Sequence, residues 1–307
     1  MEAHSGKTVE RGEQEKGEQM KTAIVTDSNS GIFEKEGERL GIYVVPMPVI
    51  IEGKTYYEGI GLTHEAFYQC LLEHKNVSSS QPSPEDVTGL WDRVFAAGYD
   101  EILYIPMSSG LSGACQTAAA LAEDYGGRVH VADNHRISVT QRHAVQDAMA
   151  LAKKGFGAEK IKEILEETAF ESIIYVGVET LEYLKKNGRV TPAGAAMGTV
   201  LNIKPLLIIE GERLDAFAKV RGTKACRKRL LEEMKKKAEE FRQGGNRLRI
   251  GVAGSFSSPT EDGEWMEMAR KVFEGEELLY DPLAFSIGCH VGAGAFGMGI
   301  SKKICET

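Results

Sequence analysis

The sequence lacks the patterns that metal, disulfide and redox proteins need. Its five cysteines, Cys70, Cys115, Cys226, Cys289 and Cys305, are odd in number and match no metal-binding or redox spacing. The seven histidines form no HxH or HxxxH pair. We therefore expect reduced thiols in a cytoplasmic protein that holds neither metal nor cofactor.

Long apolar runs and long basic runs are also missing. No stretch of 18 apolar residues occurs, so we expect no membrane span and at most peripheral membrane association. The formal net charge is -8, and the most basic segment, Lys224–Arg242, is interleaved with glutamates, which argues against nucleic-acid binding. Residues 1–20 are polar and carry no apolar segment. They are expected to be a disordered extension or leader rather than a secretion signal.

What is present favours an α/β protein. The chain has 307 residues, 42% of them hydrophobic, and this length favours two domains over one. After a short strand over 22–26, helices alternate with apolar strands, which predicts a parallel sheet with helices on both faces. These segments are helix Pro84–Ala97, strand Glu101–Met107, helix Ser112–Tyr125 and strand Arg128–Ala132. The extended run Ile42–Ile51 carries Pro46 and Pro48 and is expected at a sheet edge.

The texture changes near Phe170. A strand over Ser172–Val178 is followed by helical segments, Glu179–Asn187 and Pro192–Leu201, and by short β-rich pieces. We therefore predict an N-terminal parallel-sheet α/β/α domain over residues 21–170 and a C-terminal α/β domain over 171–307. The further segments expected in the second domain are strands Lys204–Glu210, Arg213–Val220, Arg247–Ala253 and Glu277–Tyr280, and helices Lys224–Arg242 and Glu261–Val272.

Two loops rich in serine and glycine are the strongest local signal for a site. They span Ser78–Ser83 and Ser108–Gly113, each between a strand-like and a helix-like run. Such a unit directs backbone N–H groups, hydroxyls and the positive end of a helix at one spot, which favours an anion. The simpler interpretation of either loop is a turn with a serine cap and no ligand.

A glycine-rich segment near the end matches GxGxxG over 292–297. This motif indicates a dinucleotide site only within a βαβ unit, and the residues up to Thr307 are too few for one. We expect these glycines to permit close packing of backbone against a neighbouring strand or a ligand.

Seven motifs in order give the chain a family resemblance. They are TDS at Thr26–Ser28, SSQPS at Ser79–Ser83, SSGLSG at Ser108–Gly113, LEYLKKNGRV at Leu181–Val190, LNIKPLL at Leu201–Leu207, KVRG at Lys219–Gly222 and HVGAGAFG at His290–Gly297. This order, from about Lys21 to Ile300, resembles the DegV family of bacterial fatty-acid-binding proteins.

The resemblance implies an EDD fold with two α/β domains and a fatty acid, such as palmitate, stearate or oleate, between them. A separate fatty acid kinase catalytic subunit would phosphorylate the carboxylate to an acyl phosphate for phospholipid synthesis. The binding protein itself would be non-catalytic. The resemblance places Ser79 and Ser109 at the carboxylate, Arg189 and Arg221 near it, and His290 as the family histidine. The full expected ligand-binding set is Asp27, Ser28, Ser79, Ser80, Ser108, Ser109, Gly110, Arg189, Arg221 and His290.

The chain departs from the family pattern in three places. Ser79 replaces the usual threonine, and Val291 and Ala293 replace the threonine and proline of HTGPG. The segment Asp133–Arg142 lacks the family's usual small, glycine-containing pattern. Because that segment is expected to line the pocket, the acyl preference stays open.

The residues alone leave other interpretations open. Asp27 fits a helix cap, Arg189 a partner of a surface acid, and His290 a buried structural histidine. A Cys289–His290 nucleophile is disfavoured because adjacent side chains diverge. A serine hydrolase using Ser109, with His290 as base, lacks the GxSxG elbow. A carrier of another small anionic metabolite is the third alternative.

Overall fold

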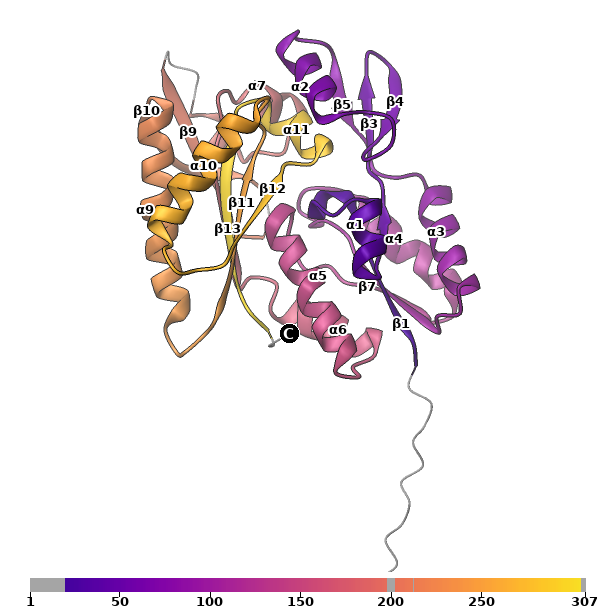
Figure 1. Cartoon of the computed structure of the whole chain (residues 1–307). Helices are drawn as coiled ribbons and strands as arrows, with labels where there is room; N and C mark the ends of the chain where they lie inside the picture. The colour runs from indigo at the N-terminus through magenta and orange to yellow at the C-terminus, as the bar shows by residue number, and fades with distance from the viewer. Residues whose placement is uncertain (1–19, 198–201, 212, 305–307) are drawn as a thin grey trace, which may run out of the picture.

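The computed structural model describes residues 20–197, 202–211 and 213–304 (Figure 1). The extension expected over residues 1–20 lies outside the described residues except for Met20, as do the end of the helix expected over Pro192–Leu201 and Cys305. Two large sheets with their helices lie side by side, and a small third sheet lies at one end (Figure 1). The expected mixed α/β architecture is therefore confirmed.

The first sheet is parallel, with strand order β2-β1-β6-β7. Its strands, in that order, are Tyr43–Val45, Thr22–Asp27, Glu101–Ile105 and Val129–Val131. Strand β6 is buried along its whole length, which explains its unbroken apolar run. The parallel sheet expected from the sequence is thus confirmed.

Helices cover both faces of this sheet. α3 and α4 pack on one face around Trp91, and α5 and α6 pack on the other. α3 begins as the sequence predicts, with Pro84 in its first turn and reciprocal hydrogen bonds between Ser83 and Asp86. The helices are α1 Glu34–Leu40, α3 Pro84–Ala96, α4 Ala114–Ala122, α5 Ser138–Lys153 and α6 Ala158–Glu167, with 3₁₀ turns η1 Ser28–Ser30 and η2 Glu123–Tyr125.

The extended run expected over Ile42–Ile51 is split between two sheets. Strand β2 ends at Val45, and β3 begins at Pro48 in an antiparallel sheet of order β4-β3-β5. The edge position is correct for β2 but wrong for β3, which is central. The two prolines explain the split, because Pro46 cannot donate to a ladder and Pro48 is tolerated as the first residue of a strand. The elements of this unit are β3 Pro48–Ile51, β4 Lys54–Tyr57, α2 His64–Leu72 and β5 Val77–Ser79.

The largest sheet is mixed and has the order β10-β9-β8-β13-β11-β12. Its strands, in that order, are Asp215–Arg221, Ile203–Ile209, Ser172–Gly177, Phe296–Lys302, Leu248–Gly254 and Leu278–Pro282. All of them follow Phe170, whereas all strands of the other two sheets precede it. The helices of this part are α7 Glu182–Asn187, α8 Pro192–Ala195, α9 Thr223–Arg242, α10 Pro259–Val272 and α11 Phe285–Val291.

The glycine-rich segment leads into a strand that the sequence did not predict. β13 lies between β8 and β11 and is antiparallel to both, so residues 292–297 do not start a dinucleotide-binding helix. The expectation of close packing against a neighbouring strand is correct at Gly297. A Cβ there would lie 3.1 Å from the carbonyl oxygen of Tyr175 on β8.

Helix α5 lies between the parallel sheet and the largest sheet and contacts both (Figure 1). It approaches the largest sheet closely because Gly251 and Gly299 are paired on adjacent strands. A Cβ on Gly251 would lie 2.4 Å from the Cβ of Val139, so only glycine fits. Polar residues of α5 are buried between the sheets, including Gln141, which donates to Asp27 of β1 over 3.0 Å.

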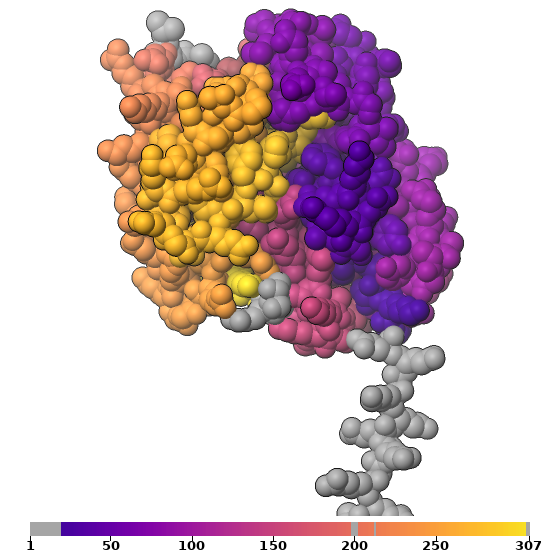
Figure 2. Space-filling model, in the orientation of Figure 1, coloured from indigo at the N-terminus to yellow at the C-terminus, as the bar shows by residue number. Residues whose placement is uncertain are grey.

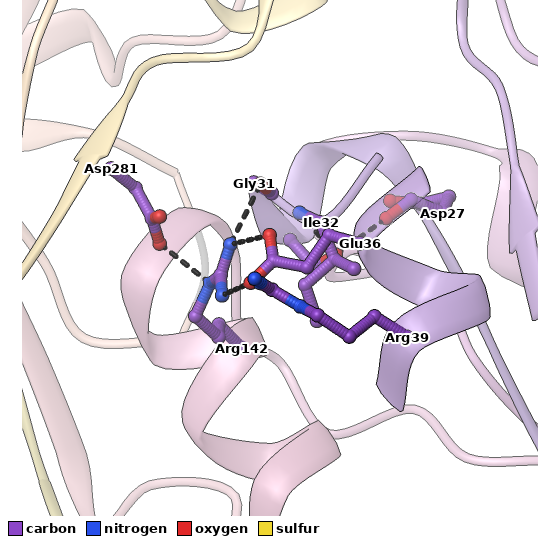
Figure 3. Close-up of polar contacts among 8 residues, drawn as sticks. Asp27, Gly31, Ile32, Glu36, Arg39, Arg142 and Asp281 are labelled. Carbon is purple, nitrogen blue, oxygen red and sulfur yellow. Dashed lines mark hydrogen bonds and ion pairs between the residues drawn. The ribbon is translucent and has the colours of Figure 1, made fainter. Parts of the chain in front are cut away.

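A charge network, the Arg142 cluster, joins three elements around the buried side chains of Arg142 and Asp281. It consists of Arg142 of α5, Glu36 and Arg39 of α1, and Asp281 of β12 (Figure 3). Arg142 meets both Glu36 oxygens at 2.8 and 2.9 Å and Asp281 at 2.7 Å. Burial raises the pKa of Asp281 to about 7, and Arg142 opposes that rise. The cluster fixes the two halves of the chain to each other.

Across the described residues, no helix combines the length and apolarity needed to cross a bilayer.

Candidate functional site

A mainly apolar cavity lies between the two halves of the chain. It has about 920 Å³ of space between its lining atoms, part of it open to solvent. On the face in Figure 2, N-terminal atoms, in indigo and purple, abut C-terminal atoms, in yellow. The apolar wall of the cavity is formed by Met47, Met107, Leu111, Ile137, Val139, Ile174, Val176, Leu184, Ile209, Leu214, Ala253, Leu283, Ile287, Val291 and Met298. The expected position of a pocket between the halves thus coincides with a real cavity.

Ser79 and His290 form the central polar pair of the cavity wall. Ser79 ends β5, and His290 lies in the last turn of α11, with 2.9 Å between Oγ and Nε2. The other ring nitrogen, Nδ1, is buried and has no partner among the described residues. Burial, reinforced by the positive charge of Arg189, lowers the pKa of His290 to about 4. The ligand-free ring is therefore neutral at physiological pH.

Arg189 also lines the cavity, just after the turn that ends α7 at Gly188. Its Nε donates to the Leu111 carbonyl over 3.2 Å, and its Nη1 donates to the Asn187 carbonyl over 2.5 Å. No described carboxylate pairs with this guanidinium, contrary to the surface-acid interpretation. Arg189 thus keeps its positive charge available beside His290.

Both serine loops contribute to the wall, the first through the expected Ser79 and Ser80 and the second through residues other than the expected Ser108, Ser109 and Gly110. Ser79, Ser80 and Gln81 line it from the first loop, and Leu111 and Ser112 line it from the second.

The expected residues of the second loop, Ser108, Ser109 and Gly110, do not line the cavity. Ser108 donates to the Gly211 carbonyl over 2.8 Å and accepts from the N–H of Gly110. Ser109 donates its backbone N–H to Asp133. Arg221 is exposed at the end of β10 and does not line the cavity.

Asp27 and Ser28 support the wall without lining it. Asp27 accepts hydrogen bonds from the N–H groups of Asn29 and Met107, so it caps η1 and holds the end of β6. Burial raises its pKa. The contacts of Asp27 are thus those of a cap residue at the start of η1.

Several lining residues were missed by sequence reasoning. Asn29 and Ser286 line the cavity and are joined by a hydrogen bond of 2.6 Å from Ser286 Oγ to Asn29 Oδ1. Asn29 follows the TDS motif directly, and this adjacency was the one available signal. Ile137 and Ser138 also line it, so the atypical segment 133–142 does form part of the wall.

No other chemistry is indicated at this site. No group of three His, Cys, Asp or Glu residues is arranged for a metal among the described residues. The Cys289 thiol is buried, which raises its pKa and keeps it protonated.

The fold and the cavity define the class of the protein: a two-part α/β protein with a mainly apolar binding cavity between the parts. The model of the DegV family, described as "Uncharacterised protein, DegV family", matches residues 21–303. The chain belongs to the DegV family.

Relatives match over nearly the whole length. A DegV domain-containing protein of Listeria innocua is 33% identical over 288 residues, covering 92% of this chain and 99% of the relative. One of Deinococcus radiodurans is 30% identical over 283 residues, covering 92% and 98%.

Solved structures of DegV family proteins match the fold over the same share of the chain. A DegV family protein of Thermus thermophilus, described as fatty-acid-binding, superposes with a TM-score of 0.80 at 30% identity, covering 92% of this chain and all of that one. DegV of Bacillus subtilis, described as a fatty acid binding protein, gives 0.79 at 28% identity, covering 92% of this chain and 100% of that one.

Proposed function

We propose that this protein is a cytoplasmic, non-catalytic fatty-acid-binding protein that presents the carboxylate of a long-chain fatty acid to a separate fatty acid kinase. The observation that carries the proposal is the cavity itself, an apolar chamber with Ser79, His290 and Arg189 together on its wall. The fatty-acid-binding descriptions of the Thermus and Bacillus proteins support the same ligand. The ligand would lie between the proposed domains, residues 21–170 and 171–307.

The carboxylate fits the polar group. The Ser79 hydroxyl is a donor, and the Arg189 guanidinium supplies a positive charge without a competing carboxylate. One of the two donor hydrogens of Ser79 and neutral His290 is used in their mutual hydrogen bond, so a second donor from this pair requires protonation of His290. Ser109 and Arg221, which the family resemblance assigns to the carboxylate, would reach it only if the loop or β10 moved, because neither lines the cavity.

The tail fits the apolar wall. Each methylene removed from water stabilises the complex by about 0.8 kcal/mol. Fifteen lining residues are apolar, so a long chain gains several kcal/mol before association costs. A small polar metabolite would leave this wall without contacts, which favours a fatty acid such as palmitate, stearate or oleate over another anion.

The serine hydrolase is disfavoured by the same geometry. His290 bonds to Ser79 rather than Ser109, and no described carboxylate orients its Nδ1. The pair therefore lacks the third member that holds a catalytic imidazole in the required tautomer.

Presentation to a kinase rests on the family resemblance and on two arginines. Arg189 at the cavity can orient a carboxylate, and Arg221 is exposed to a partner. We expect Arg189→Ala and Arg221→Ala to bind fatty acid yet to be poor substrates of a cognate kinase. Normal acyl-phosphate formation by both variants would remove this role.

Mass spectrometry of denatured, purified protein tests the ligand directly. We expect a bound fatty acid, and uptake of added palmitate or oleate by delipidated protein. Affinity should rise about fourfold with each methylene until the cavity is full, across chains of ten to twenty carbons. A flat profile would mean that the tail stays in solvent. Absence of both bound and added fatty acid would leave the small-anion carrier as the better interpretation.

A further inference from the structure

Glu58 is a buried carboxylate that the proposed function does not use. It follows β4, its side chain is 3% exposed, and no cation pairs with it among the described residues. Burial raises its pKa to about 7. A carboxyl group that is costly to bury and lacks a cation requires another structural explanation.

The contacts of Glu58 join three separate segments. Its Oε2 accepts the hydroxyl hydrogen of Ser28 in η1, and its Oε1 accepts the N–H of Ser286 in α11 over 2.5 Å. The chain at Glu58 itself is fixed by its own N–H, which donates to the Met47 carbonyl. The side chain therefore links the first turn of α11 to the parallel-sheet half.

Helix α11 carries part of the cavity wall, including the polar residues Ser286 and His290. Ser286, Ile287, His290 and Val291 all line it, one turn apart on the same helix face. The partner of His290, Ser79, belongs to β5 of the small sheet. The distance between this imidazole and hydroxyl consequently depends on where the first turn of α11 is held.

A second link acts on the same serine. Ser286 Oγ donates to Asn29, which directly follows the Ser28 that contacts Glu58. Two neighbouring residues of η1 thus hold Ser286, one directly and one through Glu58. Apolar contacts also hold this end of α11: Phe285 stacks on Phe67 with 4.7 Å between ring centroids, and a Cβ on Gly288 would lie 2.7 Å from the Phe67 ring.

We propose that Glu58 is a positioning residue for ligand binding: it holds the first turn of α11, so that His290 meets Ser79 and the carboxylate of the ligand. The proposal rests on the proposed function for the identity of the ligand. The position of His290, however, can be measured in protein without ligand.

Glu101 provides a matched control. It is also a buried carboxylate, 5% exposed, and it also accepts one hydroxyl and one N–H of the first turn of a helix. These donors are Thr22, at 2.5 Å, and Ala158 of α6, at 2.7 Å. α6 carries no residue of the cavity wall.

The experiment compares Glu58→Ala and Glu58→Gln with Glu101→Ala and Glu101→Gln. Palmitate affinity is measured on delipidated protein, and the ring signals of His290 are followed by NMR, with buried His143 as internal reference. We expect Glu58→Ala to weaken palmitate binding roughly tenfold or more and to shift the signals of His290 but not those of His143. Glu58→Gln, which retains an acceptor for Ser286, should restore most of the affinity. The Glu101 variants should bind palmitate as wild type does.

Three outcomes would overturn the proposal. They are wild-type affinity with unchanged His290 signals in Glu58→Ala, an equal loss of affinity in the Glu101 variants, or equal shifts of His290 and His143. If Glu58→Ala does not fold, Ser28→Ala, which removes the link between Glu58 and η1, gives the same two readouts. If wild-type protein does not bind palmitate, the proposed function fails, and the His290 signals alone still decide the role of Glu58.

Discussion

Two of the contacts between the halves of the chain are opposite in character. In the Arg142 cluster, Arg142 pairs with Glu36 and, across the interface, with Asp281 (Figure 3). At the cavity, the wall is apolar, and its polar members are incompletely partnered: His290 has a buried ring nitrogen without a partner, and Arg189 has no described carboxylate. In the first contact opposite charges pair with one another, whereas in the second a positive charge and a buried ring nitrogen have no such partner among the described residues.

The difference shows how a binding site can be told from a structural contact. Buried polar groups are normally hydrogen-bonded, because an unpaired one costs about 1–3 kcal/mol. Unpaired groups beside apolar space therefore indicate a missing partner with one polar end and one apolar end. Variants that remove one contact should leave the other intact, and the following predictions use this independence.

The largest effect is expected from Arg142→Ala. Removing this cation leaves Asp281 buried without a partner and should lower the free energy of unfolding by about 3–5 kcal/mol. Denaturant unfolding at several pH values measures it. Because protonation neutralises Asp281, the deficit should be smaller at pH 6 than at pH 8. Palmitate affinity of the folded variant should stay near the wild-type value. An equal loss of affinity would show that the two contacts are coupled.

A plug in the cavity should have the next largest effect. Ala253 of β11 lines the cavity, and Ala253→Phe would occupy space that the tail needs. Loss of four buried methylenes costs about 3 kcal/mol, or roughly 100-fold in affinity, as measured by palmitate titration. Ala119→Phe on the exposed face of α4 is the matched control and should bind normally. If Ala253→Phe binds palmitate as tightly as wild type does, the tail does not occupy the part of the cavity beside Ala253.

Removing the Ser79 hydroxyl should weaken palmitate binding by about 1–3 kcal/mol, because the carboxylate loses one donor. Ser109→Ala sharpens the comparison, since the family resemblance favours Ser109 but the cavity wall contains Ser79. We expect the Ser79 variant to be affected more. The reverse order in isothermal titration would place the carboxylate at the second serine loop.

The smallest effect concerns pH. Without ligand, His290 should titrate near 4, because burial and Arg189 disfavour its charged form. Its contribution to stability is present above pH 6.5 and is lost as the pH falls through 4. A bound carboxylate favours the imidazolium, so palmitate should raise the pKa of His290, and NMR titration measures both states. His290→Gln should lose the corresponding tightening of binding at lower pH. If His290 titrates identically with and without palmitate, the ligand carboxylate does not lie beside this ring.

Much of the fold could be predicted because local signals were strong. The apolar run at Glu101–Met107 and the start of α3 at Ser83 both form as expected. β13 and α11 escaped prediction. The glycines of β13 interrupt its strand pattern, and α11 spans only Phe285–Val291, too short for a clear helical period.

The site was predictable in its motifs but not in its contacts. Ser79 and His290 are 211 positions apart, and their hydrogen bond depends on how the small sheet packs against α11. The second serine loop has the expected composition, yet Ser108 turns to the Gly211 carbonyl instead of the cavity. Composition identifies residues able to bind an anion, whereas tertiary packing decides which of them do so.

The close approach of α5 to Gly251 sets the position of one wall of the cavity. Val139 fills the place of the missing Cβ at Gly251 and is also part of the cavity wall. Any side chain added at Gly251 must push Val139 and α5 away from the sheet, moving one wall of the cavity without altering a residue that touches the ligand. We therefore expect a glycine behind the wall to help set the length of acyl chain that fits under the proposed function, so that substitution outside the site would change selectivity.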